Sequence, residues 1–254
     1  MSLEKTKKEA NTREQREEIH FKYLAENYHY DWWGYQTPAA KVRFERRIAI
    51  LQQFLNFKGG DKVLECGCGA GDFTSYLSKF VIEKNISLYG IELSEAQLKN
   101  ARLKVQDSSI HLIKGSITKM PFEDNYFDFV IGNSILHHLD MELAGKEIRR
   151  VLKPGGRILF FEPNIMNPIV WLSFNIDYFR KLHQASPDEK AFWRWELEKK
   201  LISLNYKDVI VRPFDFMYPL IPKSFFLLAK KLETLLEKTF LNEIAGSLIV
   251  YAQR

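Results

Sequence analysis

The sequence is short of the features that mark several protein classes. Cysteine occurs only twice, as Cys66 and Cys68, so there is neither a disulfide framework nor a four-cysteine metal site. No uninterrupted apolar run approaches the roughly 20 residues that cross a bilayer. The first residues are charged, whereas a secretory signal would be apolar. We therefore expect a protein of the reducing cytoplasm that carries no metal.

The charge pattern gives little reason to expect a polyanionic partner. The chain has 37 basic and 32 acidic residues, a net charge of +5, but the basic residues are scattered and several fall near the N-terminus. A solvated surface accounts for this pattern better than a nucleic-acid-binding face, so no nucleic acid is expected. The length of 254 residues suits one α/β domain with an insertion or cap.

Strands and helices are predicted to alternate after residue 37. Strands are expected at 61–66, 87–92, 110–114, 127–132 and 157–162, with amphipathic helices between them. A helix near 189–204 and strands at 207–212 and 247–253 complete the pattern. It predicts an α/β fold: a doubly wound, mostly parallel sheet of seven strands, the last antiparallel, with helices on both faces.

Two regions lie outside this alternation. Apolar helical segments near 163–188 and 215–243 are predicted to be cap insertions over the sheet. Residues 1–37 are predicted to form an N-terminal tail, or an exposed helix, followed by an aromatic lid. The lid residues can instead form a hydrophobic staple against the cap; they are Tyr30, Trp32, Trp33 and Tyr35.

A glycine-rich turn follows the first strand of the alternation. Gly67, Gly69 and Gly71 have the spacing G-x-G-x-G, and Asp72 stands where a dinucleotide fingerprint would need its last glycine. A pyrophosphate here would face Glu65 and Asp72 and be repelled. A ligand carrying an ammonium and a sulfonium would be attracted, so the loop favours S-adenosylmethionine over a nicotinamide dinucleotide.

Glu92 ends the second strand of the pattern. A carboxylate at this position can accept hydrogen bonds from both ribose hydroxyls of a nucleoside ligand. The alternative is a carboxylate that merely favours the start of the next helix through the helix dipole. The glycine loop upstream favours ribose binding.

Four motifs between Asp61 and Asn164 carry a family resemblance. In order they are VLECGCGAG, GIELS, KGSITKMPFEDNYFDFVIGNSILHHL and EIRRVLKPGGRILFFEP. Together they resemble the class I S-adenosylmethionine-dependent methyltransferases, which implies a methyltransferase domain over 38–254. The resemblance assigns cofactor contacts along these motifs: Glu65, Gly67, Gly69 and Gly71 to the methionine part, with Cys68 at a variable loop position; Glu92 to the ribose; Leu93, Ser116 and Ile117 to the adenine; and Asn133 beneath the cofactor.

One position departs from the family pattern. Ser116 stands where these enzymes commonly have an aspartate that accepts a hydrogen bond from the adenine amino group. A neutral hydroxyl accepts more weakly than a carboxylate. The adenine contact is therefore the least specific of the cofactor assignments.

The candidate catalytic residues follow the fourth strand of the alternation. His137 and His138 are predicted as general bases, although one can simply pack under the loop and the other cap the next helix. Glu162 and Asn164 leave the fifth strand and can orient the acceptor, or simply supply loop polarity. The two cysteines lack the partners of a reactive thiol.

The acceptor is predicted only by class. The chain lacks the Asn/Asp-Pro-Pro-Tyr/Phe motif of amino-methylating nucleic-acid enzymes, and its cap is aromatic and aliphatic, so a small or partly apolar acceptor is expected. Docking on a membrane through Lys223, Lys230 and Lys231 is a less favoured alternative. A nicotinamide-dependent oxidoreductase and a non-catalytic S-adenosylmethionine-binding subunit are the alternative functions. The sequence leaves the oligomeric state open.

Overall fold

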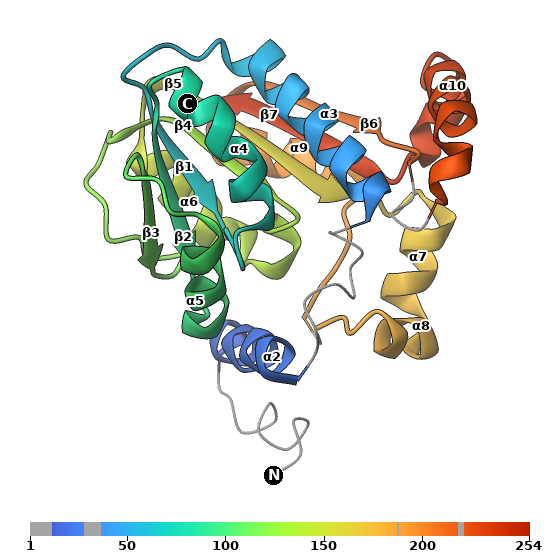
Figure 1. Cartoon of the computed structure of the whole chain (residues 1–254), viewed down its shortest axis with the longest axis horizontal. Coiled ribbons are helices and arrows are strands. Elements are labelled where there is room, and N and C mark those ends of the chain that lie inside the picture. Colours follow the sequence, from blue (N-terminus) through green and yellow to red (C-terminus); the bar gives the residue numbers. More distant parts are fainter. Residues whose placement is uncertain (1–11, 28–36, 187, 218–220) are drawn as a thin grey trace.

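A computed structural model describes residues 12–27, 37–186, 188–217 and 221–254. Its sheet has seven strands in the order β3-β2-β1-β4-β5-β7-β6 (Figure 1). β7 runs antiparallel to both of its neighbours, and the other pairs are parallel. The predicted doubly wound sheet is thus confirmed. The strands are β1 (Lys62–Cys66), β2 (Ser87–Glu92), β3 (Ile110–Lys114), β4 (Phe127–Asn133), β5 (Leu152–Pro163), β6 (Lys207–Phe214) and β7 (Ser247–Gln253).

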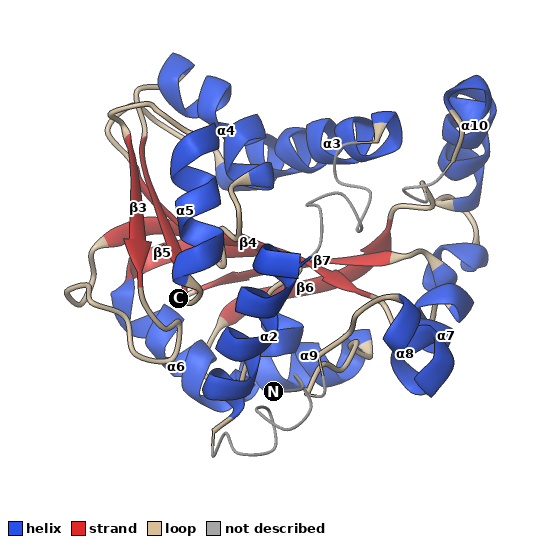
Figure 2. Cartoon of the chain, turned by 60° about the horizontal axis from the view of Figure 1, so that its bottom comes forward, coloured by secondary structure: helices blue, strands red, loops and turns tan. Residues whose placement is uncertain are grey.

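Helices cover both faces of the sheet (Figure 2), and they enclose two apolar clusters against it. On one face α3 (Pro38–Leu55) and α4 (Asp72–Glu83) pack Phe44, Leu51 and Leu77 against the strands. On the other face α6 (Met141–Val151) and α9 (Arg194–Ser203) bury Ile148 and Leu197. Successive side chains of β5 enter opposite clusters, as the period of a strand requires.

Polar caps set where several helices begin. The Thr37 hydroxyl accepts from the Ala40 N–H ahead of α3, and the Asp140 carboxylate accepts from Glu142 and Leu143 ahead of α6. Ser94 caps α5 (Glu95–Lys104). Helix α9 begins later than predicted, at Arg194, because residues just before it pair with the chain after β5: the Ile165 N–H donates to the Phe192 carbonyl.

The N-terminal helix differs from the exposed segment that was expected. α2 (Arg13–Asn27) packs beside α5 and buries Glu17, His20 and Leu24. The buried face of α2 is hard to recognise in the sequence, because it contains two polar residues, Glu17 and His20, which are buried against polar partners. The predicted lid residues Tyr30, Trp32, Trp33 and Tyr35 lie outside the described residues.

The cap helices follow β5 and β6. They are α7 (Pro168–Asn175), α8 (Asp177–Leu182) and α10 (Phe226–Leu236), with short 3₁₀ turns at Lys223–Phe225 and Phe240–Ile244. Both views place the three helices at one end of the molecule. Within the described residues, no helix is long and apolar enough to cross a membrane.

Candidate active site

A cavity of about 770 Å³ lies at the carboxyl ends of the parallel strands, between α2 and α7. The two candidate histidines and all but one of the predicted cofactor contacts line it: Glu65, Gly67, Cys68, Gly69, Glu92, Leu93, Ser116, Ile117, Asn133, His137 and His138. Gly71 is the exception. It stands at the start of α4 with a φ of 79°, and a Cβ there would meet Ala101 Cα at 3.0 Å. Its role is thus to let α4 pack closely on α5.

Two loop glycines shape the floor of the cavity. Gly67 has a φ of 67°, and its N–H donates to the Ile91 carbonyl at 2.8 Å. A Cβ on Gly67 would lie 2.5 Å from Ile135 Cδ1, whereas one on Gly69 would meet no atom within 4 Å. The Gly69 backbone therefore borders open space, where a ligand can approach closely.

Two buried carboxylates make this part of the cavity negative. Glu65 is 1% exposed, and among the described residues its one hydrogen-bonded side chain is the neutral Thr74, at 2.8 Å. Burial raises its pKa to about 7, and the negative charges of Asp72 and Glu92 add to the effect. Burial also raises the pKa of Glu92, against the opposing pull of backbone hydrogen bonds. Two uncompensated carboxylates fit a ligand that brings positive charge.

Glu92 also holds the glycine loop in place. Its carboxylate accepts from the Gly69 N–H at 3.1 Å and from the Ser94 N–H at 2.8 Å. The thiols of Cys66 at the end of β1 and of Cys68 in the loop are free and buried, and burial raises the pKa of both. Neither Cys66 nor Cys68 is thereby set up as a thiolate nucleophile.

A carboxylate from α2 reaches the predicted adenine edge. The Ser116 and Thr118 hydroxyls both donate to Glu14 Oε1. Sequence analysis missed Glu14, which lies 102 positions from Ser116 and belongs to no motif. The Glu14 carboxylate lies beside Ser116, the position at which the family commonly has an aspartate.

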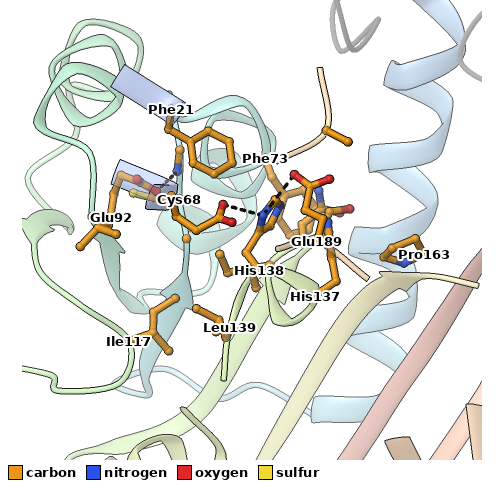
Figure 3. A pocket seen from close by; sticks show the side chains of 18 of the residues that line it. Phe21, Cys68, Phe73, Glu92, Ile117, His137, His138, Leu139, Pro163 and Glu189 are labelled. Carbon is orange, nitrogen blue, oxygen red and sulfur yellow. Dashed lines mark hydrogen bonds and ion pairs between the residues drawn. The ribbon is translucent and has the colours of Figure 1, made fainter. Parts of the chain in front are cut away.

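His138 contacts two carboxylates, Glu17 and Glu189; Figure 3 labels His138 and Glu189. Its Nδ1 is 3.0 Å from Glu17 Oε2 and 3.3 Å from Glu189 Oε1. Burial alone would lower its pKa, but Glu189 and Glu17 outweigh burial and raise it to about 9. The ligand atoms of these three residues lie within 4.8 Å of one another, a spacing that a metal ion can also use. A proton on His138 supplies the positive charge that a metal ion would otherwise bring.

His137 is oriented by a different carboxylate. Its Nδ1 is 2.8 Å from Glu162 Oε2, while Glu162 Oε1 accepts from the Ile135 and Leu136 N–H groups. A carboxylate only accepts, so Nδ1 donates and Nε2 is the basic nitrogen. The Asn164 amide donates to the Glu243 and Ala245 carbonyls. Glu162 and Asn164 thus hold neighbouring segments together and do not line the cavity.

Comparison with known proteins identifies the family to which the chain belongs. A family model described as a methyltransferase domain matches residues 64–160. The demethylmenaquinone methyltransferase of Staphylococcus saprophyticus is 33% identical over 170 residues, which cover 63% of this chain and 71% of the relative. The chain belongs to the class I S-adenosylmethionine-dependent methyltransferases. Its methyl donor is thus S-adenosylmethionine, as predicted from the glycine loop, and family membership favours methyl transfer over both alternative functions.

Solved structures of methyltransferases share the fold. A protein of Thermotoga maritima described as a possible histamine N-methyltransferase aligns with a TM-score of 0.66 at 17% identity, over 93% of this chain and 98% of its own. Phosphoethanolamine N-methyltransferase 2 of Haemonchus contortus, in complex with S-adenosylmethionine, aligns with a TM-score of 0.61 at 20% identity, over 83% and 52%.

The other end of the methyltransferase cavity carries a cluster of apolar side chains: Ile169, Val170, Phe174, Phe216 and Met217. Its polar lining includes Arg43 and Arg47, which both contact Asp215, at 2.8 and 3.4 Å. Arg47 also donates to the Asn133 side chain.

The pKa of Glu65 predicts pH-dependent cofactor binding. If Glu65 must be ionised to hold the ammonium of S-adenosylmethionine, affinity should be full above pH 7 and fall as the pH drops through the pKa of about 7. The slope should approach about tenfold per pH unit. Calorimetric titration between pH 5.5 and 8.5 measures it. In Glu65→Gln the step near pH 7 should vanish; the same step in that variant would assign it to another group.

Proposed function

We propose that this methyltransferase acts on a small apolar acceptor of the quinol class, and that His137 removes the proton that the acceptor loses. The observation that carries the proposal is the pairing of apolar cavity walls with one oriented imidazole. His137 lies beside the apolar end of the cavity, called the acceptor end here, with its ring centroid 5.9 Å from that of Phe174. The relatives named for demethylmenaquinone support the same acceptor class.

Charge at the acceptor end disfavours an amine substrate. Arg43 and Arg47 line this end of the cavity, and the carboxylate of Asp215 already contacts both. The two arginines would repel a cationic ammonium, while a neutral ring with an ionisable hydroxyl would not be repelled. The walls of Ile169, Val170 and Phe174 add apolar contact for the body of such a ring.

The chain contributes alignment and a base. When bound, S-adenosylmethionine supplies a methyl group already activated by its sulfonium. Holding the acceptor in line can contribute about 7–11 kcal/mol through proximity. His137 accepts the proton at Nε2, and Glu162 stabilises the resulting imidazolium from the other side of the ring. His138 is protonated at neutral pH, so we assign it to holding α2 on the domain rather than to base catalysis.

His137→Ala is expected to lower kcat on a short-tailed demethylmenaquinol by about a hundredfold or more, a usual contribution of a general base. The assay is the transfer of labelled methyl from S-adenosylmethionine under reducing conditions. The dissociation constant for the cofactor should change little, because the proposed contacts of His137 are with the acceptor.

Two comparisons make this assay decisive. Histamine and phosphoethanolamine should be poor acceptors, and Glu162→Gln should lower kcat, because it removes the carboxylate that stabilises the imidazolium of His137. Faster methylation of either amine than of the quinol would refute the acceptor class. An unchanged kcat in His137→Ala would refute the base.

A further inference from the structure

The cap helices are apolar yet almost uncovered. α7 and α8 bury no residue, and the single buried residue of α10 is Glu233, in helices that are described throughout. Figures 1 and 2 place the three helices at one end of the molecule. Their outer faces, together called the cap surface here, carry large exposed side chains: Trp171, Tyr178, Leu182, Leu227, Leu228 and Leu235.

This degree of exposure is unusual for large apolar residues. Leu227 is 71% exposed, Tyr178 70% and Leu235 62%. Single exposed leucines are ordinary, but several on adjoining helices indicate a surface that binds something. The amphipathic pattern of a surface helix would bury leucines and expose charge, whereas α10 buries Glu233 and exposes its leucines.

The charges around the cap surface are mostly basic. The two acids at the inner side of α10, Glu233 and Glu237, share Arg46 at 2.7 and 2.6 Å, which offsets one of their two negative charges. Asp177 is the exposed acid of α8. The exposed basic residues are Lys181, Lys223, Lys230, Lys231 and Lys238. The outer face therefore combines apolar side chains with positive charge.

We propose that the cap surface docks on an anionic lipid bilayer. Leucines would enter the boundary of the acyl chains, Trp171 and Tyr178 would lie at the level of the head groups, and the lysines would contact lipid phosphates. The charge pattern selects this occupant over a second copy of the chain, because a second copy would bring the same lysines. The helices are too short to cross the bilayer, so the contact is with one surface.

α7 connects the cap surface to the cavity. Ile169, Val170 and Phe174 line the cavity, while Trp171 on the same helix is 44% exposed. An apolar acceptor dissolved in the bilayer would thus meet the acceptor end without crossing water. This last step rests on the proposed function, whereas the docking itself does not.

Vesicle co-sedimentation of the full chain tests the proposal. We expect binding to vesicles of phosphatidylcholine with phosphatidylglycerol, weaker binding to phosphatidylcholine alone, and weakening with added KCl. The double variant Leu227→Glu/Leu235→Glu should lower the partition coefficient by about tenfold or more. Both positions are exposed, so the variant should keep the unfolding temperature and S-adenosylmethionine affinity of the wild type.

A matched control uses apolar residues exposed elsewhere. Ile82 and Leu103 are 51% and 68% exposed, so Ile82→Glu/Leu103→Glu adds the same charge away from the cap and should bind vesicles as the wild type does. No wild-type binding to the anionic vesicles, or equal loss in both double variants, would overturn the proposal. A micromolar dimer abolished by the cap variant alone would overturn it in favour of a second copy. Vesicle binding without quinol methylation would overturn the proposed acceptor and leave the docking standing.

Discussion

Glu92→Ala should weaken the binding of S-adenosylmethionine by at least about a hundredfold. The carboxylate is 8% exposed, and its oxygens hold the Gly69 and Ser94 N–H groups. In the proposed complex it also accepts from the ribose. Hydrogen bonds to a buried charge contribute about 1.5–3 kcal/mol each, so losing two of them corresponds to roughly this change in affinity.

Calorimetry with S-adenosylmethionine and its demethylated product measures the loss. Both ligands should be affected alike, because they share the ribose. Glu92→Gln should fall between the wild type and Glu92→Ala, since an amide keeps one acceptor. Glu95→Ala is the control: Glu95 is an exposed neighbour on α5 that pairs with Arg102, and cofactor affinity should not change. A loss of less than about fivefold in a folded Glu92→Ala protein would remove Glu92 from the ribose site.

Stability should depend on pH through His138. Its pKa is raised from an ordinary 6.5 to about 9, so its contribution to stability is full below pH 6.5 and is lost as the pH rises through 9. A difference of this size corresponds to about 3 kcal/mol. Glu17 has the opposite sense: burial alone would raise its pKa, but the hydrogen bond and charge of His138, together with Ser186 and His20, outweigh burial and lower it. Its contribution is lost as the pH falls through that lowered pKa.

Glu17→Ala should therefore destabilise the protein by about 3 kcal/mol at pH 6.5, because it removes one partner of a buried ion pair. Denaturant unfolding at pH 6.5 and pH 9 measures the effect, which should shrink at the higher pH. Glu18→Ala is the control on the same helix: Glu18 pairs with Lys114 at 3.4 Å in an exposed position, and its loss should cost about 0.5 kcal/mol or less. Equal effects of the two substitutions would mean that the buried cluster does not hold α2.

The strands and the glycine loop could be predicted from sequence because their signals are local. The segments 87–92, 110–114 and 247–253 match β2, β3 and β7 residue for residue, since each is an apolar run bounded by polar or turn residues. The motifs that contain β1 and β2 then predicted that the carboxylates of both strands lie at the same edge of the sheet. Residues such as Glu65 and Glu92 could be placed because each belongs to a strand end.

The contacts of α2 could not be predicted in the same way. Glu17 meets His138 across 121 positions of sequence, and Glu14 meets Ser116 across 102. No periodicity marks these pairs, because both acids lie on a charged helix that resembles a solvated one. Sequence analysis also treated His137 and His138 as equivalent bases. Only their three-dimensional neighbours, one carboxylate for His137 and two for His138, distinguish them.

The cavity has α2 as a wall near the adenine edge and α7 as a wall near the acceptor end. The expected positions of cofactor and acceptor therefore lie against different walls of one cavity. With the cap surface docked as proposed, spent cofactor would leave past α2 into the surrounding water while α7 stayed in contact with lipid. The enzyme would then complete many turnovers during one period of membrane binding. Its turnover rate would depend on how often α2 moves away from the cavity rather than on how often the protein binds a vesicle.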